Sequence, residues 1–347
     1  MNPFLSAIPA RPQEELLLEL VPSLAGQRVL CNTAGRGQFA LAAATKAQQV
    51  SLHFLDLYHL QQCRITAGEL PPNLTLACEA DLAAGPFDLA ALSVSKQGDG
   101  ELVRDLLQQA HERLEIGGRM AVTTDNPQDS FLHDELRKLF AKVTRRPSST
   151  GVLYLATKIE QLRKLKDFAC EFPFRDGERL IHLRTRPGVF SHRRLDGGAR
   201  VLINEMQIEP GMKLLDLGCG SGAVAVAAAL RGESGTVHAV DSNPRAVEAT
   251  TWAATKNGTQ NVTAILDCDG SHLTDDCYEL VLANAPYFSN FRIAEHFART
   301  AARTLIAGGN ALFVTKTPGW YTERLPKWFS HIESRPGKNY TVVAAKK

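Results

Sequence analysis

The sequence predicts an α/β protein built from two tandem domains, each a doubly wound parallel sheet, that arose by duplication. Two observations predict this fold. Short apolar stretches alternate with helical stretches in both halves, which is typical of parallel sheets covered by helices. The chain also repeats its own pattern. Its 347 residues exceed what one hydrophobic core usually serves, and this agrees with two domains.

The first repeated block is a strand, a glycine-rich turn and an alanine-rich helix. Residues 28–44 read RVLCNTAGRGQFALAAA, and residues 213–229 read KLLDLGCGSGAVAVAAA, at an offset of 185. At the same offset Asp56 matches Asp241, and each aspartate ends a second apolar strand. Two independent features in one register favour duplication over a chance likeness between α/β domains.

Later blocks continue the repeat with small changes in loop length. The matching strands are 87–96 with 278–287 and 153–158 with 341–346. We therefore expect a first domain at 1–158 and a second at 200–347. Residues 159–199 copy nothing in the first half and are predicted to form an interdomain segment.

The composition excludes several classes of protein. The 39 Lys and Arg and 37 Asp and Glu give a formal charge of +2, which argues against coating nucleic acid by bulk charge but allows a local basic patch. Seven cysteines without a Cys-x-x-Cys pair predict neither a metal site nor a disulfide scaffold, and free thiols indicate a cytoplasmic protein. No apolar run approaches the roughly 18 residues that span a bilayer, so we expect no membrane partner.

The glycine-rich turn of the second half has the form of a ligand-binding loop. Asp216 ends a buried strand, and Gly218, Gly220 and Gly222 follow at G-x-G-x-G spacing. Glycines let the backbone turn tightly and approach a ligand closely, and the next helix points free N–H groups at it. Asp241, at the end of the next strand, is placed to accept hydrogen bonds from ribose hydroxyls.

A second motif follows the apolar strand ELVLA. Asn284, Ala285, Pro286 and Tyr287 come at its carboxyl end, which opens into the ligand crevice of a doubly wound sheet. An asparagine oxygen and a backbone carbonyl can both accept hydrogens of an exocyclic amine and localise its lone pair. The proline fixes the backbone direction, and the tyrosine can stack on a flat substrate. The motif therefore predicts alignment of a nucleobase amine.

Together, the two motifs resemble the class I S-adenosylmethionine-dependent methyltransferases, which have a Rossmann-like fold, and the resemblance implies S-adenosyl-L-methionine as the cofactor. It places the methionine end against the acidic residue and the turn, the ribose at the second acidic residue, and the adenine beside two later positions. These residues are Asp216, Gly218, Cys219, Gly220, Gly222, Asp241, Ser242 and Asp269, with Asn284 beside the transferred methyl. The family's amino-group enzymes carry Asn-Pro-Pro-Tyr/Phe, where this chain has Ala285 at the second position.

The interdomain segment narrows the resemblance. Residues 187–198 read PGVFSHRRLDGG, which is similar to the segment before the cofactor domain of the bacterial tandem-domain ribosomal RNA guanine-N2 methyltransferases. In that family the element lies over the cofactor, which implies that Phe190, Ser191 and Asp196 belong to the cofactor site. The resemblance covers nearly the whole chain and implies methylation of a guanine N2 amine in ribosomal RNA.

Charge supports an RNA partner. Residues 161–200 hold 10 basic and 5 acidic side chains, whereas residues 201–347 hold 14 of each. We therefore expect Arg184, Arg186, Arg193 and Arg194 to contact phosphates of ribosomal RNA or of a ribosomal subunit, and we expect a monomer. The alternatives are methylation of adenine N6 or of a protein glutamine, and a non-catalytic RNA-binding protein that keeps the fold.

The first copy of the repeat lacks the chemistry of the second. It keeps Gly35 and Gly37, but it has Asn32 where the second half has Asp216, and it reads Ser-Val-Ser-Lys at 93–96. We expect it not to bind the cofactor. Its Asp56 is predicted to cap a helix or to face solvent.

Overall fold

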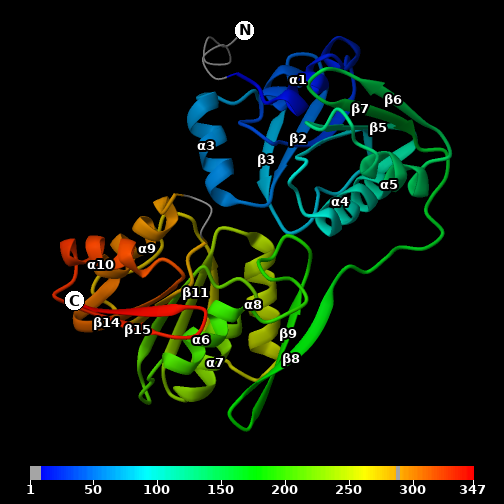
Figure 1. The fold of residues 1–347 in the computed structure, drawn as a ribbon. Helices are drawn as coiled ribbons and strands as arrows, with labels where there is room; N and C mark the ends of the chain where they lie inside the picture. The colour runs from blue at the N-terminus through cyan, green and yellow to red at the C-terminus, as the bar shows by residue number, and fades with distance from the viewer. Residues whose placement is uncertain (1–8, 287–289) are drawn as a thin grey trace. The chain divides into compact units, whose positions relative to one another are not determined.

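The computed structural model describes residues 9–286 and 290–347 and divides the chain into two compact units, Met1–Phe168 and Ala169–Lys347. Each unit contains a seven-stranded sheet with helices on both faces (Figure 1). The strand orders are β3-β2-β1-β4-β5-β7-β6 and β12-β11-β10-β13-β14-β16-β15. The two orders are the same when counted from the first strand of each unit, so the predicted duplication and fold class are confirmed.

The first unit contains α1 (Pro12–Leu18), η2 (Val21–Ser23), β1 (Arg28–Asn32), α2 (Gln38–Ala43), β2 (Gln49–Phe54), α3 (Leu57–Ala67), β3 (Leu74–Cys78), β4 (Phe87–Val94), α4 (Gly100–Arg113), β5 (Leu114–Thr124), α5 (Phe131–Leu139), β6 (Val143–Pro147) and β7 (Val152–Thr157). Buried side chains of α1, α2 and α3 pack on one face of its sheet, and those of α4 and α5 pack on the other.

The second unit contains β8 (Cys170–Asp176), β9 (Arg179–Thr185), α6 (Gly197–Glu205), β10 (Lys213–Leu217), α7 (Ala223–Arg231), β11 (Thr236–Asp241), α8 (Pro244–Lys256), β12 (Val262–Leu266), β13 (Tyr278–Ala283), α9 (Arg292–Thr304), β14 (Leu305–Thr315), α10 (Pro318–Arg324), η4 (Leu325–Lys327), β15 (His331–Pro336) and β16 (Thr341–Lys346). Helices α6, α7 and α8 cover one face of the sheet, and α9 and α10 cover the other.

The sheets are mixed, whereas the sequence pattern predicts parallel ones. In the second unit β12, β11, β10, β13 and β14 run parallel, but β16 pairs antiparallel with both β14 and β15. The reason is the short turn between β15 and β16, which can only join antiparallel neighbours because a parallel pair needs a crossover of a dozen residues or more. The same hairpin, β6 with β7, closes the first unit.

The order of the strands positions the site. From β10 the chain winds outward through β11 and β12, and then crosses to β13 on the other side of β10. In open α/β sheets, the point where the winding reverses leaves a crevice at the carboxyl ends of the two central strands. Residues that follow β10 and β13 therefore meet at one edge of the second sheet.

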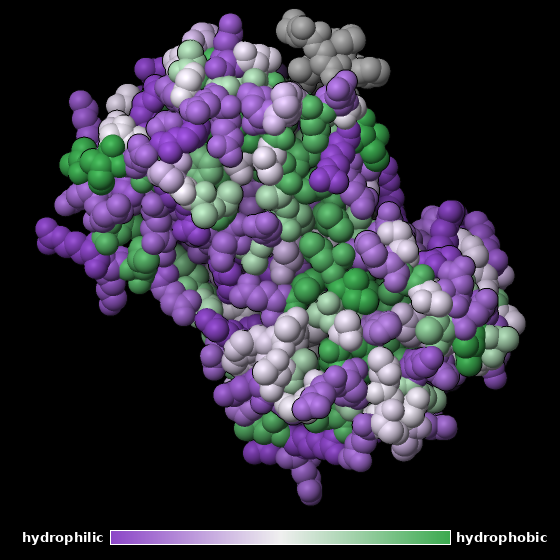
Figure 2. All heavy atoms as spheres, turned by 180° about the vertical axis from the view of Figure 1, so that it is seen from behind, coloured by the Kyte–Doolittle hydropathy of each residue, from purple (hydrophilic) through white to green (hydrophobic). Residues whose placement is uncertain are grey.

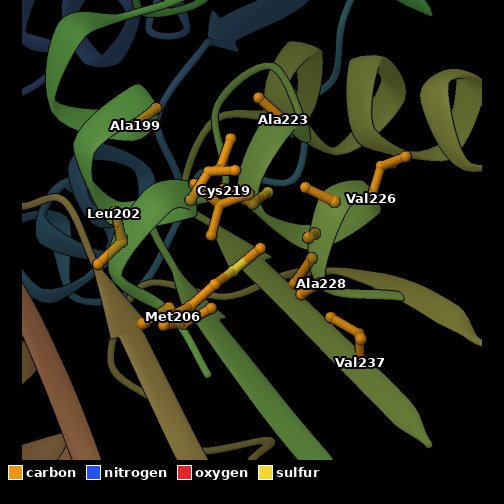
Figure 3. Packing of buried hydrophobic residues seen from close by; sticks show 14 of the residues in the cluster. Ala199, Leu202, Met206, Cys219, Ala223, Val226, Ala228 and Val237 are labelled. Atoms are coloured by element: carbon orange, nitrogen blue, oxygen red, sulfur yellow. The ribbon is translucent and has the colours of Figure 1, made fainter. Parts of the chain in front are cut away.

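Small side chains let α7 lie close to this sheet. Seven consecutive residues of α7, Ala223 to Ala229, are buried, and they contact α6 and β11 in the largest core of the second unit. In Figure 3, the side chain of Met206, which directly follows α6, extends toward Ala228 of α7. Close packing of this kind fixes the start of α7 and with it the glycine turn.

The second half of the predicted interdomain segment folds with the second unit. Strands β8 and β9 form an antiparallel hairpin. The side chain of Asn257, just after α8, accepts from the His182 N–H at 2.9 Å and donates to the His182 carbonyl at 2.7 Å. The hairpin is therefore fastened to the helix that follows β11.

In the first unit, the chain's own carboxylate fills the glycine turn. Glu14 of α1 is fully buried, and it accepts from the Thr33 hydroxyl and from the backbone N–H groups of Gly35 (3.3 Å) and Gln38 (3.2 Å). Burial raises the pKa of this carboxyl group. At the repeat offset, the counterpart of Glu14 in the second unit is Ala199, which has no side-chain acceptor. The first turn is thus closed by α1.

Two residues that correspond to site positions of the second unit, Asn32 and Asp56, have structural roles in the first. Asn32 accepts from the Ser93 N–H at 2.6 Å and donates to the Ser93 carbonyl at 3.2 Å, which fastens β1 to β4. Asp56 is the N-cap of α3 and accepts from the Tyr58 N–H at 2.9 Å, as predicted for a helix cap. These polar groups are used within the fold.

Helices of the described residues are short, and none combines the length and apolar character that spanning a membrane would require. Hydrophilic side chains cover much of the face seen in Figure 2, and hydrophobic ones gather in smaller groups.

Replacing Glu14 should destabilise the first unit. Glu14→Ala removes a buried carboxylate that accepts from the Thr33 hydroxyl and from the N–H groups of Gly35 and Gln38, which should lower the free energy of unfolding by about 1–3 kcal/mol. Hydrogen exchange resolved by mass spectrometry, in increasing urea, can follow β1 separately from β10. Glu15→Ala, an exposed neighbour on the same helix, is the matched control and should change little. Equal effects of the two variants would contradict the role given to Glu14.

Gly222→Ala should be more costly than the same change at Gly258. Both glycines have positive φ, +78° and +71°, so both variants bear a similar backbone strain of about 1 kcal/mol. A Cβ at Gly222 would lie 2.8 Å from the Cα of Thr250 on α8, whereas a Cβ at Gly258 meets nothing within 4 Å. Denaturant titration should show about 1–3 kcal/mol more destabilisation for Gly222→Ala. Equal losses would mean that α7 and α8 can move apart freely.

Candidate active site

Three of the predicted residues meet at the carboxyl edge of the second sheet. Asp216 lies in β10, opposite Ala239 of β11 on one side and Leu282 of β13 on the other. Asp241 is the last residue of β11, and Asn284 directly follows β13. Because these three strands are neighbours, the side chains border the crevice at the reversal of strand order.

The glycine turn is tied to β11 through its backbone. The N–H groups of Gly218 and Cys219 both donate to the Val240 carbonyl, at 2.8 and 3.0 Å, and the Gly220 N–H donates to the Asp241 carboxylate at 2.9 Å. Gly218 and Gly222 have φ of +77° and +78°, a conformation that costs other residues energy. The turn is therefore fixed against the end of β11.

Asp216 is the most unusual group in the site. Its side chain is 2% exposed, and among the described residues its Oδ2 has no hydrogen-bond partner. Burial raises the pKa of Asp216 to about 7, against the lowering effect of the Ala225 N–H, and the nearby charge of Asp241 raises it further. A buried carboxyl group with an open oxygen is suited to a positively charged ligand group.

Asp241 is held in place by backbone N–H groups on both oxygens. Its Oδ1 accepts from Asn243 at 2.9 Å and its Oδ2 accepts from Gly220. Ser242, between the two, is half-buried. A carboxylate oriented in this way can accept hydrogen bonds from a vicinal diol, which fits a ribose.

Asn243 and Arg245 fasten the interdomain segment to this edge. Asn243, whose position two residues after Asp241 also makes it a candidate for the adenine pocket, caps α8 through its Oδ1 and donates from Nδ2 to the Gly188 carbonyl at 2.8 Å. The buried Arg245, which the sequence does not predict for the site, donates to the Pro187 carbonyl at 2.7 Å. The anchored loop leads to Phe190, which is 58% exposed, and to Ser191, which has φ +57°.

The side chain of Asn284 is hydrogen-bonded to the residue that begins α6. Its Nδ2 donates to Asp196 Oδ2 at 2.9 Å, and Asp196 is also the N-cap of α6, accepting from the Ala199 N–H at 3.0 Å. Sequence resemblance places Asp196 with the cofactor, and the structure joins it to the side chain of Asn284. Ala285 is buried, Pro286 is half-buried, and Tyr287 lies outside the described residues.

The loop after β12 is organised by Asp267. Its oxygens accept from the N–H groups of Asp269 and Gly270 at 2.9 Å each and of His272 at 3.0 Å, and these bonds lower the pKa of Asp267 to about 2 despite its burial. Asp269 accepts from the Ser271 N–H and is exposed. The loop thus uses Asp267 internally and leaves Asp269 nearer the surface.

The four arginines expected to contact RNA differ in exposure. Arg193 and Arg194 are exposed, whereas Arg184 and Arg186 are half-buried, and Arg186 pairs with Glu248 of α8 at 3.1 Å. Among the described residues, no group of three or more His, Cys, Asp or Glu side chains could hold a metal ion.

Aromatic side chains of α9 and α10 complete the surroundings. A Cβ on Gly218 would lie 3.2 Å from the ring of Phe297, so this ring packs directly on the glycine turn. Phe291 stacks on Trp320 with ring centroids 5.0 Å apart. Sequence analysis missed Phe297, although its helical spacing from buried Ala294 and Ala301 is a usable signal.

Comparisons with known proteins agree with this geometry. Residues 180–344 match the methyltransferase small domain family. The uncharacterized protein YbxB of Bacillus subtilis (strain 168) is 31% identical over 169 residues, which cover 46% of this chain and 83% of YbxB. Ribosomal RNA small subunit methyltransferase C of Pseudomonas aeruginosa (strain LESB58) is 30% identical over 149 residues, 42% of this chain and 44% of that protein. The chain thus spans less than half the length of that curated relative.

A solved structure is similar over both units. The T. thermophilus 16S rRNA N2 methyltransferase, in complex with AdoMet and guanosine, superposes with a TM-score of 0.82 over 97% of this chain and 92% of that chain, at 22% identity. At this identity the likeness shows the shared fold. With the family match over the second unit and the extent of the YbxB match, the chain belongs to the methyltransferase small domain family.

Proposed function

We propose that the protein uses S-adenosyl-L-methionine to methylate the exocyclic N2 amine of a guanine in ribosomal RNA. The observation that carries the proposal is the buried Asp216, whose Oδ2 has no hydrogen-bond partner among the described residues and which lies at the same edge of the sheet as Asp241 and Asn284. A cationic ligand with a ribose, next to an acceptor for an amine, matches these three groups in kind.

The residues at the crevice fit the cofactor. The ionised Asp216 and the glycine turn would hold the methionine end, and Asp241 would accept from the ribose hydroxyls. The family resemblance places Ser242 and Asp269 beside the adenine, and Phe190 and Ser191 over the cofactor. When bound, S-adenosylmethionine supplies an electrophilic methyl group on a sulfonium centre.

The chain itself supplies alignment. Asn284 Oδ1 and the Ala285 carbonyl would accept the two hydrogens of the target amine, so that its lone pair points toward the methyl group. Pro286 fixes the direction of that backbone, and Tyr287 would stack on the base. No nucleophile on the protein is needed, and rate enhancement comes from positioning and electrostatic stabilisation.

Three observations favour ribosomal RNA as the substrate. Relatives named as ribosomal RNA methyltransferases match part of this chain, and the structure with the same fold holds guanosine. The segment 161–200 concentrates the positive charge, and Arg193 and Arg194 are exposed. The partner would be ribosomal RNA or a ribosomal subunit, contacted through Arg184, Arg186, Arg193 and Arg194. We further propose that the protein acts as a cytoplasmic monomer.

Comparing ribosomal RNA nucleosides by mass spectrometry, with and without the gene, tests this function. Deletion should remove one N2-methylguanosine, and the wild-type gene should restore it. Asn284→Ala should not restore it, because the amine loses an acceptor. Asn310→Ala, an exposed asparagine on β14, is the control and should restore it fully. An unchanged nucleoside profile after deletion would overturn the substrate, and cofactor binding without methylation would favour the non-catalytic alternative.

Cofactor binding should weaken as the pH falls through 7. Asp216 has a pKa of about 7 because it is buried, so it takes up a proton below that pH, whereas the cofactor's ammonium group binds the ionised form. Well below pH 7, Kd should therefore rise about tenfold per pH unit, and above pH 8 it should be flat. Calorimetric titration with S-adenosylmethionine from pH 5.5 to 8.5 measures this.

The control for the pH profile is Asp216→Asn. This variant keeps the shape of the side chain but cannot titrate. It should therefore bind S-adenosylmethionine weakly, and residue 216 should no longer make the Kd depend on pH. A wild-type profile that is flat between pH 5.5 and 7 would show that Asp216 is not the cation's partner.

A further inference from the structure

We propose that Asp196 is a positioning residue that fixes the amide of Asn284 so that Oδ1, and not Nδ2, is offered to the target amine. The inference rests on the proposed function for its catalytic meaning. Its structural part stands on the contacts of the Asn284 side chain. It replaces the expectation that Asp196 belongs to the cofactor site.

The hydrogen bond to Asp196 decides the orientation of the amide. The two ends of an asparagine side chain are nearly equal in shape but opposite in polarity, so only the surrounding network sets which end faces which way. An ionised carboxylate can only accept, and Asp196 Oδ2 lies 2.9 Å from Nδ2 of Asn284. In the described part of the chain, Oδ1 accepts no hydrogen bond. The amide is therefore held with Nδ2 toward Asp196 and Oδ1 at its other end.

The absence of a side chain at Gly198 makes room for the hydrogen bond between Asn284 and Asp196. A Cβ at Gly198 would lie 2.9 Å from both Asn284 Oδ1 and Asp196 Oδ2, and 3.2 Å from Asn284 Nδ2. The amide thus lies against the bare backbone of the first turn of α6, in space that any side chain would fill. The pair of glycines after Asp196 lets α6 begin directly beside the carboxyl end of β13.

A rotated amide would oppose the reaction. If Nδ2 faced the target, two N–H donors would meet the N–H donors of the amine, and no oxygen would localise its lone pair. Asp196 prevents this because rotation would bring Asn284 Oδ1 against its carboxylate oxygen. Two acceptors at 2.9 Å repel each other, so the rotated state is unfavourable.

One oxygen of Asp196 both caps α6 and holds the side chain of Asn284, so substitutions of Asp196 can separate the two roles. Oδ2 accepts from Asn284 and from the Ala199 N–H. Asp196→Asn keeps an acceptor oxygen that the helix N–H orients, so it should still hold Nδ2. Asp196→Ser also caps helices well, but its hydroxyl lies on a shorter side chain and does not reach Asn284.

Steady-state methylation of ribosomal RNA by purified full-length variants measures the catalytic effect. Asp196→Ser should lower kcat by about 10- to 100-fold, and Asp196→Asn by less than about threefold. In both variants the Kd of S-adenosylmethionine should stay within about threefold of wild type. Asp56→Ser, which changes the cap of α3 in the first unit, is the control for loss of an aspartate cap and should leave kcat unchanged. A large rise in cofactor Kd with unchanged kcat would return Asp196 to the cofactor site.

Combining variants tests whether Asp196 acts through Asn284. In an Asn284→Ala background, Asp196→Ser should cause no further loss of kcat, because the side chain it positions is already gone. If the double variant instead loses kcat by the product of the two single losses, Asp196 acts on something other than Asn284 and the proposal is overturned.

A measurement without substrate separates this proposal from the proposed function. In ¹⁵N NMR spectra, the side-chain NH₂ signal that disappears in Asn284→Ala identifies Asn284. Its hydrogen exchange should be slow in wild type and in Asp196→Asn, and at least about tenfold faster in Asp196→Ser. If the Asn284 NH₂ group stays protected from exchange in Asp196→Ser, then Asp196 does not hold this side chain. If the wild-type protein methylates no ribosomal RNA but its Asn284 NH₂ group is still protected from exchange, the proposed function is refuted and the hydrogen bond to Asp196 is not.

Discussion

The pairing of β10 with both β11 and β13 is the constraint on which the rest of the structure depends. Parallel strands end at the same edge, so this pairing brings Asp216, Asp241 and Asn284 together although 68 residues separate the first from the last. Neither aspartate can leave the edge without breaking a central strand. Positions on strands are more exact than positions on loops, which suits a site whose chemistry is alignment.

The two units share a fold but differ in one side chain at the glycine turn. Both keep the strand order and a glycine turn, but α1 of the first unit directs Glu14 into its turn, and α6 of the second has Ala199 there. A carboxylate that accepts the turn's N–H groups competes directly with any anionic or polar ligand for them. In the first copy this acceptor is Glu14 of α1, whereas in the second the Gly220 N–H donates to Asp241, at the end of the neighbouring strand.

Much of this architecture follows from the sequence, because the repeat reports it twice. The glycine turn, the two acidic strand ends and the Asn-x-Pro motif carry local signals, and the structure brings them to one edge. The Glu14 closure and the Asp196–Asn284 bond were not predictable, because each joins residues that meet only after the helices pack, and the bond to Asn284 spans 88 positions. The antiparallel hairpins have a local cause, the short turns between β6 and β7 and between β15 and β16, but the strand pattern alone did not reveal their direction.

Three contacts connect the interdomain segment to the elements that bear the site. Arg245 holds Pro187, Asn243 holds Gly188, and Asn284 meets Asp196 at the other end of the loop. The loop between these anchors carries Arg193 and Arg194, so its basic side chains are held beside the crevice while its ends are fixed. A shift of that loop would act on Asn284 through Asp196 before it acted on the sheet. The segment therefore contacts both the helix that follows β11 and the residue that follows β13.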